Sequence, residues 1–179
     1  PMRHQPKEPN PQPPSYAEQA RHRLEALDAL DQRDRLVERR QAEILQEKTD
    51  RLREAEREAE EALERLGKRP SGPFVGKRRR EAWDQERRDR EQALERAKYA
   101  YIDHVQGMDR EQARRDREAA KTQALAEVER DEPELAELAR EGERIKRDEL
   151  AEQRAQSQAR DQQRVQERAM KGPGKGRSR

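Results

Sequence analysis

The chain has 179 residues, of which 46% are charged, and its 42 lysines and arginines nearly balance its 40 aspartates and glutamates. Leucine, isoleucine, valine and phenylalanine together make up about 12% of the residues, whereas chains that fold into a packed globule usually exceed roughly 20%. Because burial of apolar side chains is the main offset to the entropy lost on folding, this composition argues against a globular enzyme. It predicts an all-α protein of long charged helices.

The N-terminal segment, residues 1–14, contains six prolines. Proline fixes φ and lacks a backbone N–H, so such a segment favours extended polyproline-type conformations and is not helical. We predict a disordered leader or stiff linker here. The alternative is a ligand for a proline-binding module.

A first long helix is predicted over residues 15–66. Ser15 and Glu18 have the spacing of a capping box, in which the hydroxyl and the carboxylate each accept a hydrogen bond from a backbone N–H at the start of the helix. No glycine or proline follows until Gly67, a residue type that commonly ends helices.

The second half of this helix has the three- and four-residue spacing of a coiled-coil seam, formed by Leu45, Leu52, Ala59, Leu63 and Leu66. Asp34 and Gln41 interrupt the apolar spacing between Leu30 and Ile44, so we expect weaker packing there and a shift of register near Ile44 and Leu45. The seam predicts pairing with another helix, either within this chain, in a second copy or in a partner coiled coil.

Residues 67–77 are the clearest break in the helical pattern. They contain three glycines and two prolines, which exclude a helix. A break of this length allows the first helix to fold back on a second one, so we predict a helical hairpin. The side chains expected to pack within the hairpin are Phe74, Trp83, Leu94, Tyr101 and Val105.

A helical region is predicted after the break, over residues 78–131. Gly107 is a candidate stop within this region, and Asp109 with Gln112 offers another capping pair.

A charged helix is predicted over residues 132–171, with Pro133 suited to its first position. Residues 151–164 are polar on all sides, so a helix there either rests on Glu–Arg pairs alone or frays. We predict that residues 172–179 form a disordered basic tail.

Residues that could carry chemistry are scattered. The three histidines, His4, His22 and His104, have no partner at metal-ligand spacing, and no apolar pocket is expected that would raise the pKa of a carboxyl for acid catalysis. We therefore expect no enzyme activity, no metal, no cofactor and no small-molecule substrate. No run of about 18 apolar residues is present, so we expect no membrane span and a cytoplasmic location.

Two segments contain cations and no acid. The first, residues 68–80, holds Lys68, Arg69, Lys77, Arg78, Arg79 and Arg80; the second, residues 171–179, holds Lys171, Lys175, Arg177 and Arg179. Cations on a flexible backbone can follow the phosphates of a nucleic acid and gain affinity by counterion release, and Phe74 and Trp83 could stack on unpaired bases. The alternatives are that the first group simply opens a helix beside packed aromatics, and that the second is a solubilising tail.

The segments Leu66–Phe74 and Gly76–Trp83 resemble part of the C-terminal region of plasmid mobilisation proteins of the relaxase type. The resemblance implies a non-catalytic helical tail, in which the basic segments contact DNA or dock to the transfer apparatus. The tyrosine nucleophile and the three-histidine metal site of that family have no counterpart here, because the tyrosines (Tyr16, Tyr99, Tyr101) lack the surrounding motif.

The sequence therefore favours a helical, partly coiled-coil accessory module that contacts DNA or the transfer machinery. The alternative is a purely structural coiled coil or spacer that binds protein.

Overall fold

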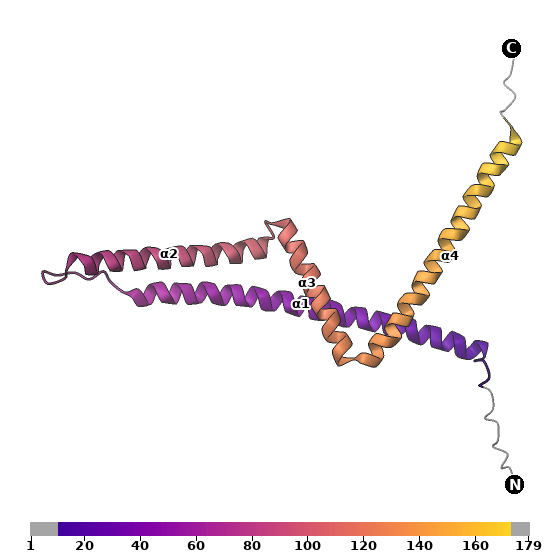
Figure 1. The fold of residues 1–179 in the computed structure, drawn as a ribbon, viewed down its shortest axis with the longest axis horizontal. Coiled ribbons are helices and arrows are strands. Elements are labelled where there is room, and N and C mark those ends of the chain that lie inside the picture. The colour runs from indigo at the N-terminus through magenta and orange to yellow at the C-terminus, as the bar shows by residue number, and fades with distance from the viewer. Residues whose placement is uncertain (1–10, 173–179) are drawn as a thin grey trace, which may run out of the picture. The chain divides into compact units, whose positions relative to one another are not determined.

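The computed structural model describes residues 11–172 and contains four α-helices in that range: α1 (Tyr16–Leu66), α2 (Lys77–Gln106), α3 (Arg110–Asp131) and α4 (Pro133–Lys171) (Figure 1). No strand occurs among the described residues. The all-α prediction is confirmed. Residues 11–14 of the predicted leader are exposed and lie outside any helix, and the remainder of the leader lies outside the described residues.

The helices begin and end where local sequence signals favour it. Ser15 N–H donates to Glu18 Oε2 (3.1 Å) and Glu18 N–H donates to Ser15 Oγ (3.3 Å), which is the predicted capping box. Gly107 ends α2 with φ at +58°, a left-handed conformation that glycine adopts without steric cost. As a result, the predicted helical region 78–131 consists of two helices, and the first of them begins one residue earlier, at Lys77.

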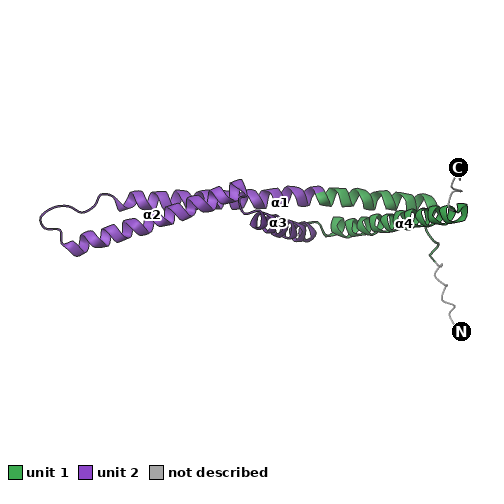
Figure 2. Cartoon of the chain, turned by 90° about the horizontal axis from the view of Figure 1, so that it is seen from above, with its two compact units in different colours: residues 1–34, 132–179 green, residues 35–131 purple. Residues whose placement is uncertain are grey.

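The chain forms two compact units, residues 1–34 with 132–179 and residues 35–131 (Figure 2). Helix α1 contributes its first part to the first unit and its remainder to the second. Among residues 11–172, no helix is both long enough and apolar enough to cross a bilayer.

The core of the first unit is built mostly from small side chains. The buried residues of its two helical segments, apart from Arg33, are Ala26, Ala29 and Leu30 on α1 and Ala136, Ala139 and Gly142 on α4. At Gly142 the two backbones approach so closely that an added Cβ would lie 2.3 Å from the carbonyl oxygen of Ala26. The absence of a side chain at position 142 therefore allows α4 to cross α1 in direct contact.

The core of the second unit contains Val37, Ala124 and Val128, with Leu36, Ile44 and Leu125 packed against it. It lies in the stretch of α1 where the sequence predicted weak packing, and that prediction is wrong. Gln41, which interrupts the apolar spacing, donates from Nε2 to the carbonyl oxygen of Arg117 on α3 (3.0 Å). A polar side chain is thus satisfied at the helix contact by the neighbouring backbone.

Helix α2 folds back along α1 through the loop 67–76, as the predicted hairpin requires (Figure 1). Cross-helix hydrogen bonds follow its length: Trp83 Nε1 donates to the Leu66 carbonyl oxygen (3.5 Å), and Arg53 Nη2 donates to the Tyr101 hydroxyl (2.8 Å). The predicted seam residues on α1 are only half-buried in this arrangement: Leu45, Leu52, Ala59, Leu63 and Leu66.

Three of the five side chains expected to pack within the hairpin are half-buried, namely Trp83, Leu94 and Tyr101. The prediction is wrong for Phe74, which is 99% exposed, and for Val105, which is 55% exposed. Phe74 lies in the loop, outside both helices. Val105 is rotated by about 100° around the helix from His104, whose ring nitrogen lies 2.9 Å from the Thr49 hydroxyl of α1.

Candidate nucleic-acid interface

The loop 67–76 and the first turn of α2 carry the cations that the sequence predicted as a nucleic-acid contact. We call Lys68, Arg69, Lys77, Arg78, Arg79 and Arg80 the loop patch. Lys68 and Arg69 follow the end of α1, and the other four open α2. The first turn of α2 has no acid, and its N-cap, Gly76, makes no side-chain cap hydrogen bond. Cations are electrostatically disfavoured at the N-terminus of a helix, so their own helix does not account for this placement.

Two members of the loop patch are engaged by the protein itself. Arg69 makes a bidentate pair with Asp84 of α2, from Nε to Oδ1 (3.0 Å) and from Nη2 to Oδ2 (2.9 Å). Arg80 Nη2 donates to the carbonyl oxygens of Gly72 (3.2 Å) and Val75 (3.1 Å). These two guanidinium groups hold the loop, and their predicted contact with nucleic acid stays a prediction.

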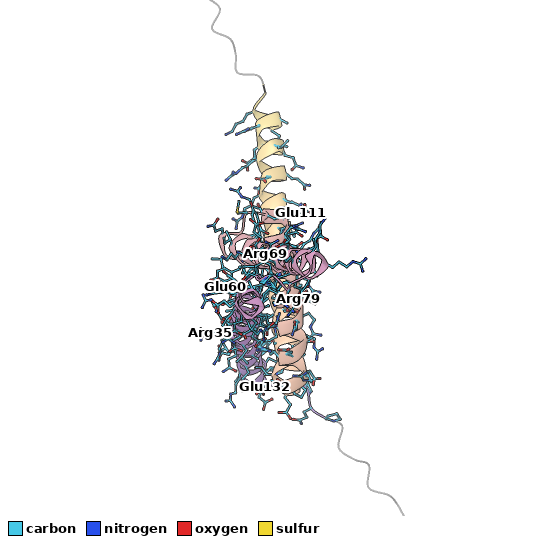
Figure 3. All side chains as sticks on the ribbon, turned by 90° about the vertical axis from the view of Figure 1, so that its left-hand side faces the viewer. Arg35, Glu60, Arg69, Arg79, Glu111 and Glu132 are labelled. Carbon is cyan, nitrogen blue, oxygen red and sulfur yellow. The ribbon has the colours of Figure 1, made fainter. Side chains whose placement is uncertain are left out.

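The other four cations of the loop patch face solvent. The side chain of Lys77 is 89% exposed and its Nζ lies 3.8 Å from Glu81 Oε1, a pair worth at most about 1 kcal/mol at the surface. Lys68, Arg78 and Arg79 are exposed and form no ion pair with any described residue. Figure 3 shows the side chains as sticks, with Arg69 and Arg79 labelled. Four cations of the patch are therefore available to an anionic ligand.

The two aromatic residues beside the patch have different roles. Trp83 is half-buried, its indole N–H points to the end of α1, and the Arg87 guanidinium carbon lies 5.4 Å from the centre of its ring. That geometry is a cation–π contact, so the Trp83 ring already has a partner within the protein. Phe74 is 99% exposed, which leaves its ring free to stack.

The second predicted basic segment is described only in part. Lys171 is the last residue of α4 and is exposed. Lys175, Arg177 and Arg179 lie outside the described residues.

Apart from the loop patch, polar side chains gather where α1 meets the turn between α2 and α3. They line a cleft of about 190 Å³, whose lining includes Lys48, His104 and Asp116. Lys48 Nζ lies 2.6 Å from Asp116 Oδ2, and this hydrogen bond lowers the pKa of the Asp116 carboxyl. The Thr49 hydroxyl donates to the Leu45 carbonyl oxygen (3.1 Å) and therefore accepts from His104 Nε2 (2.9 Å). Each group has a partner within the protein, so the cluster joins the three helices.

Sequence reasoning missed the arginines that join α1 to the helices packed on it. Arg33 is buried and pairs with Glu143 of α4 and with Asp34. Arg40 pairs with Glu127 of α3, which lowers the pKa of the Glu127 carboxyl. With 33 arginines in the chain, nothing in the spacing distinguishes these two from arginines on the solvent face.

Among residues 11–172, no group of three or more histidine, aspartate or glutamate side chains is arranged to hold a metal ion. Comparisons of the chain with protein-family models, with curated proteins and with solved structures found no match.

Proposed function

We propose that this chain is a non-catalytic helical module that binds single-stranded nucleic acid through the loop patch. The observation that carries the proposal is the 99% exposed ring of Phe74 within a loop flanked by exposed cations. Lys68, Lys77, Arg78 and Arg79 would contact phosphates, and Phe74 would stack on a base.

The chemistry of the loop supports a single-stranded ligand. Base–aromatic stacking requires an unpaired base, and it contributes about 1–3 kcal/mol per base. The cations add affinity through counterion release and require no base sequence. The uncapped N–H groups at the start of α2 also favour an anion at this point.

Arg69 and Arg80 support the proposal by fixing the loop before a ligand arrives. Arg69 ties the start of the loop to α2, and Arg80 ties its middle to the first turn of α2. A loop already held in one conformation loses less entropy on binding, so the affinity available from few contacts increases.

For the biological process, we propose an accessory role in plasmid mobilisation. Its support is the resemblance of residues 66–83 to the helical C-terminal region of relaxase-type proteins, because that segment contains the loop patch. A cytoplasmic location would follow from this role.

The test is an oligonucleotide titration over a series of salt concentrations, with the full chain and the triple variant K68Q/R78Q/R79Q. We expect the wild type to bind single strands at about 50 mM salt, and the variant to lose about 2 from the slope of log affinity against log salt, since each phosphate contact contributes about 0.7. Phe74→Ala should weaken single-strand binding without changing the slope, because stacking releases no counterion.

The matched control is R35Q/R51Q/R96Q, which removes the same charge from exposed arginines that have no ion pair in the described part of the chain. Its affinity should stay close to that of the wild type. Equal losses in the two triple variants, or no binding by the wild type, would contradict the proposal.

A second candidate, a structural coiled coil, is favoured by one observation: the seam from Leu45 to Leu66 stays half-exposed in the hairpin. A second copy or a partner helix could cover it further. Sedimentation analysis at about 100 µM chain tests the homo-oligomer, because association of this kind depends on concentration. A strictly monomeric chain at this concentration would exclude the homo-oligomer.

A further inference from the structure

The last 21 residues of α4, residues 151–171, form a helix without any packing partner in the described chain. We call this segment the α4 arm. Every residue of the arm is exposed, and the last ion pair of α4 with α1 lies before it, between Glu149 and Arg23. At 1.5 Å per residue the arm is about 30 Å long. Figure 3 shows side chains radiating from this end of α4.

Four cations of the arm lie along one side. Arg160, Arg164, Arg168 and Lys171 follow each other at spacings of four, four and three residues, which on an α-helix places them within an arc of about 80°. We call these four residues the arginine stripe. None of them forms an ion pair with a described residue. Glu167, beside the stripe, instead accepts a hydrogen bond from Gln163 (3.3 Å).

The composition of the arm argues against a protein partner. Apart from alanine, its only apolar residues are Val165 and Met170, which do not make a coiled-coil seam. Exposed ion pairs alone contribute about 0.3–0.5 kcal/mol each, too little for a stable helix pair. The same lack of an apolar face argues against insertion into a membrane surface, which needs buried apolar area.

A polyanion, in contrast, requires only cations. Counterion release supplies affinity without apolar burial, and glutamine and serine side chains add hydrogen bonds to phosphates. The arm contains Ser157 and six glutamines, at positions 153, 156, 158, 162, 163 and 166. It contains no aromatic residue, so stacking on unpaired bases is not available to it.

We propose that the α4 arm binds double-stranded nucleic acid, with the arginine stripe against the phosphates. The major groove is about 12 Å wide and admits an α-helix, so a bare helix of this length can lie along it. The proposal is independent of the loop patch, because it rests on different residues and on a different form of nucleic acid.

The experiment compares the full-length wild type with R160Q/R164Q/R168Q on duplex and single-stranded oligonucleotides over a salt series. For duplex, we expect the variant to lose more than roughly tenfold in affinity at about 0.1 M salt and about 2.7 from the salt slope, since each duplex phosphate contact contributes about 0.9. Single-strand binding should change much less. Circular dichroism checks that the helix content is retained, as expected for glutamine at exposed helix positions.

Two further variants act as controls. Q153A/Q156A/Q162A changes the same helix without changing its charge, and its salt slope should equal that of the wild type. E152Q/E167Q removes negative charge from the arm and should raise duplex affinity. An unchanged duplex affinity in R160Q/R164Q/R168Q would overturn the inference, as would arm-dependent binding to vesicles of anionic lipid with none to duplex.

The loop variant K68Q/R78Q/R79Q separates this inference from the proposed function. Loss of single-strand binding in the loop variant, with no loss of duplex binding in the arm variant, would leave the loop proposal standing and overturn this one. The reverse pattern would support the arm and contradict the loop patch.

Discussion

Substitution of Gly142 by alanine tests whether α1 and α4 are in backbone contact. On helix propensity alone, Gly→Ala in a helix interior stabilises by about 0.8–1.0 kcal/mol. The structure predicts that Gly142→Ala destabilises the protein instead. The new methyl group would lie 2.3 Å from the Ala26 carbonyl oxygen, 3.0 Å from the Ala26 carbonyl carbon and 3.0 Å from Leu30 Cβ.

The overlap cannot be relieved by a side-chain rotation, because the nearest atoms belong to the backbone of α1. Ordinary carbon contacts have their optimum near 3.5–4.0 Å, so α4 would have to move away by about 1 Å. That movement would open gaps around Ala29 and Ala139, which are now buried. Overpacking of this kind costs about 1–3 kcal/mol. After the propensity gain is subtracted, we expect a net loss of up to about 2 kcal/mol.

The measurement is urea unfolding followed by circular dichroism at 222 nm, with hydrogen exchange used to locate the effect in α4. Gly76→Ala is the matched control, since its added Cβ meets nothing within 4 Å and its φ of −67° suits alanine. It should change the free energy of unfolding by no more than about 0.5 kcal/mol. If Gly142→Ala stabilised the protein by the full propensity increment, the close approach of the two helices would be refuted.

Three further predictions concern ion pairs and the free end of α4. Arg33→Met should lower the free energy of unfolding by about 1–2 kcal/mol, because the buried Arg33 loses charged hydrogen bonds, including the one to Glu143; an unchanged urea midpoint would contradict this. The hydrogen bond from Arg40 lowers the pKa of Glu127 in the folded chain, so its contribution should be complete above about pH 4.3 and fall as the pH drops through the lowered pKa. Acid titration of Glu127→Gln should then show a smaller loss of stability than the wild type over that range. Truncation after Leu150 should leave the urea midpoint unchanged, since all 21 removed residues of α4 are exposed; a lower midpoint would show that the arm contacts the rest of the chain.

The fold could be predicted wherever a local signal decides the backbone. The Ser15–Glu18 box, the stop at Gly107 and the start of α4 at Pro133 all follow from interactions within a few residues. The hairpin follows from the glycines and prolines of the loop 67–76, which leave the chain no helical alternative.

The core could not be predicted in the same way, because alanine carries most of it. Ala26, Ala124 and Ala139 are fully buried, whereas Ala17 and Ala151 are exposed. The alanine methyl group is compatible with either environment, so the spacing of alanines along a helix is a weak signal of burial. The large apolar residues that guided the seam prediction are only half-buried.

At the candidate site, the sequence likewise does not reveal which cations pair with acids. The sequence reveals that residues 68–80 contain no acid. However, Asp84 and Glu81, which lie within the next turn of α2, pair with Arg69 and Lys77 respectively. Which arginines fix the structure depends on contacts that form only after folding. The exposed position of Phe74 likewise depends on where both helices end.

Arginine accounts for 33 of the 42 basic residues, and the structure divides these arginines into two groups. The guanidinium group presents a planar fork of five donors, which suits both carboxylates and phosphates. Arg33, Arg40 and Arg69 direct it to carboxylates of other helical segments, where close alanine contacts alone bury little apolar area. Arg79 and Arg164 direct the same group to solvent, with no ion pair to any described residue. Arginines of the first group hold helices together, and those of the second remain available to an anionic ligand, so one residue type supports both the fold and the proposed binding.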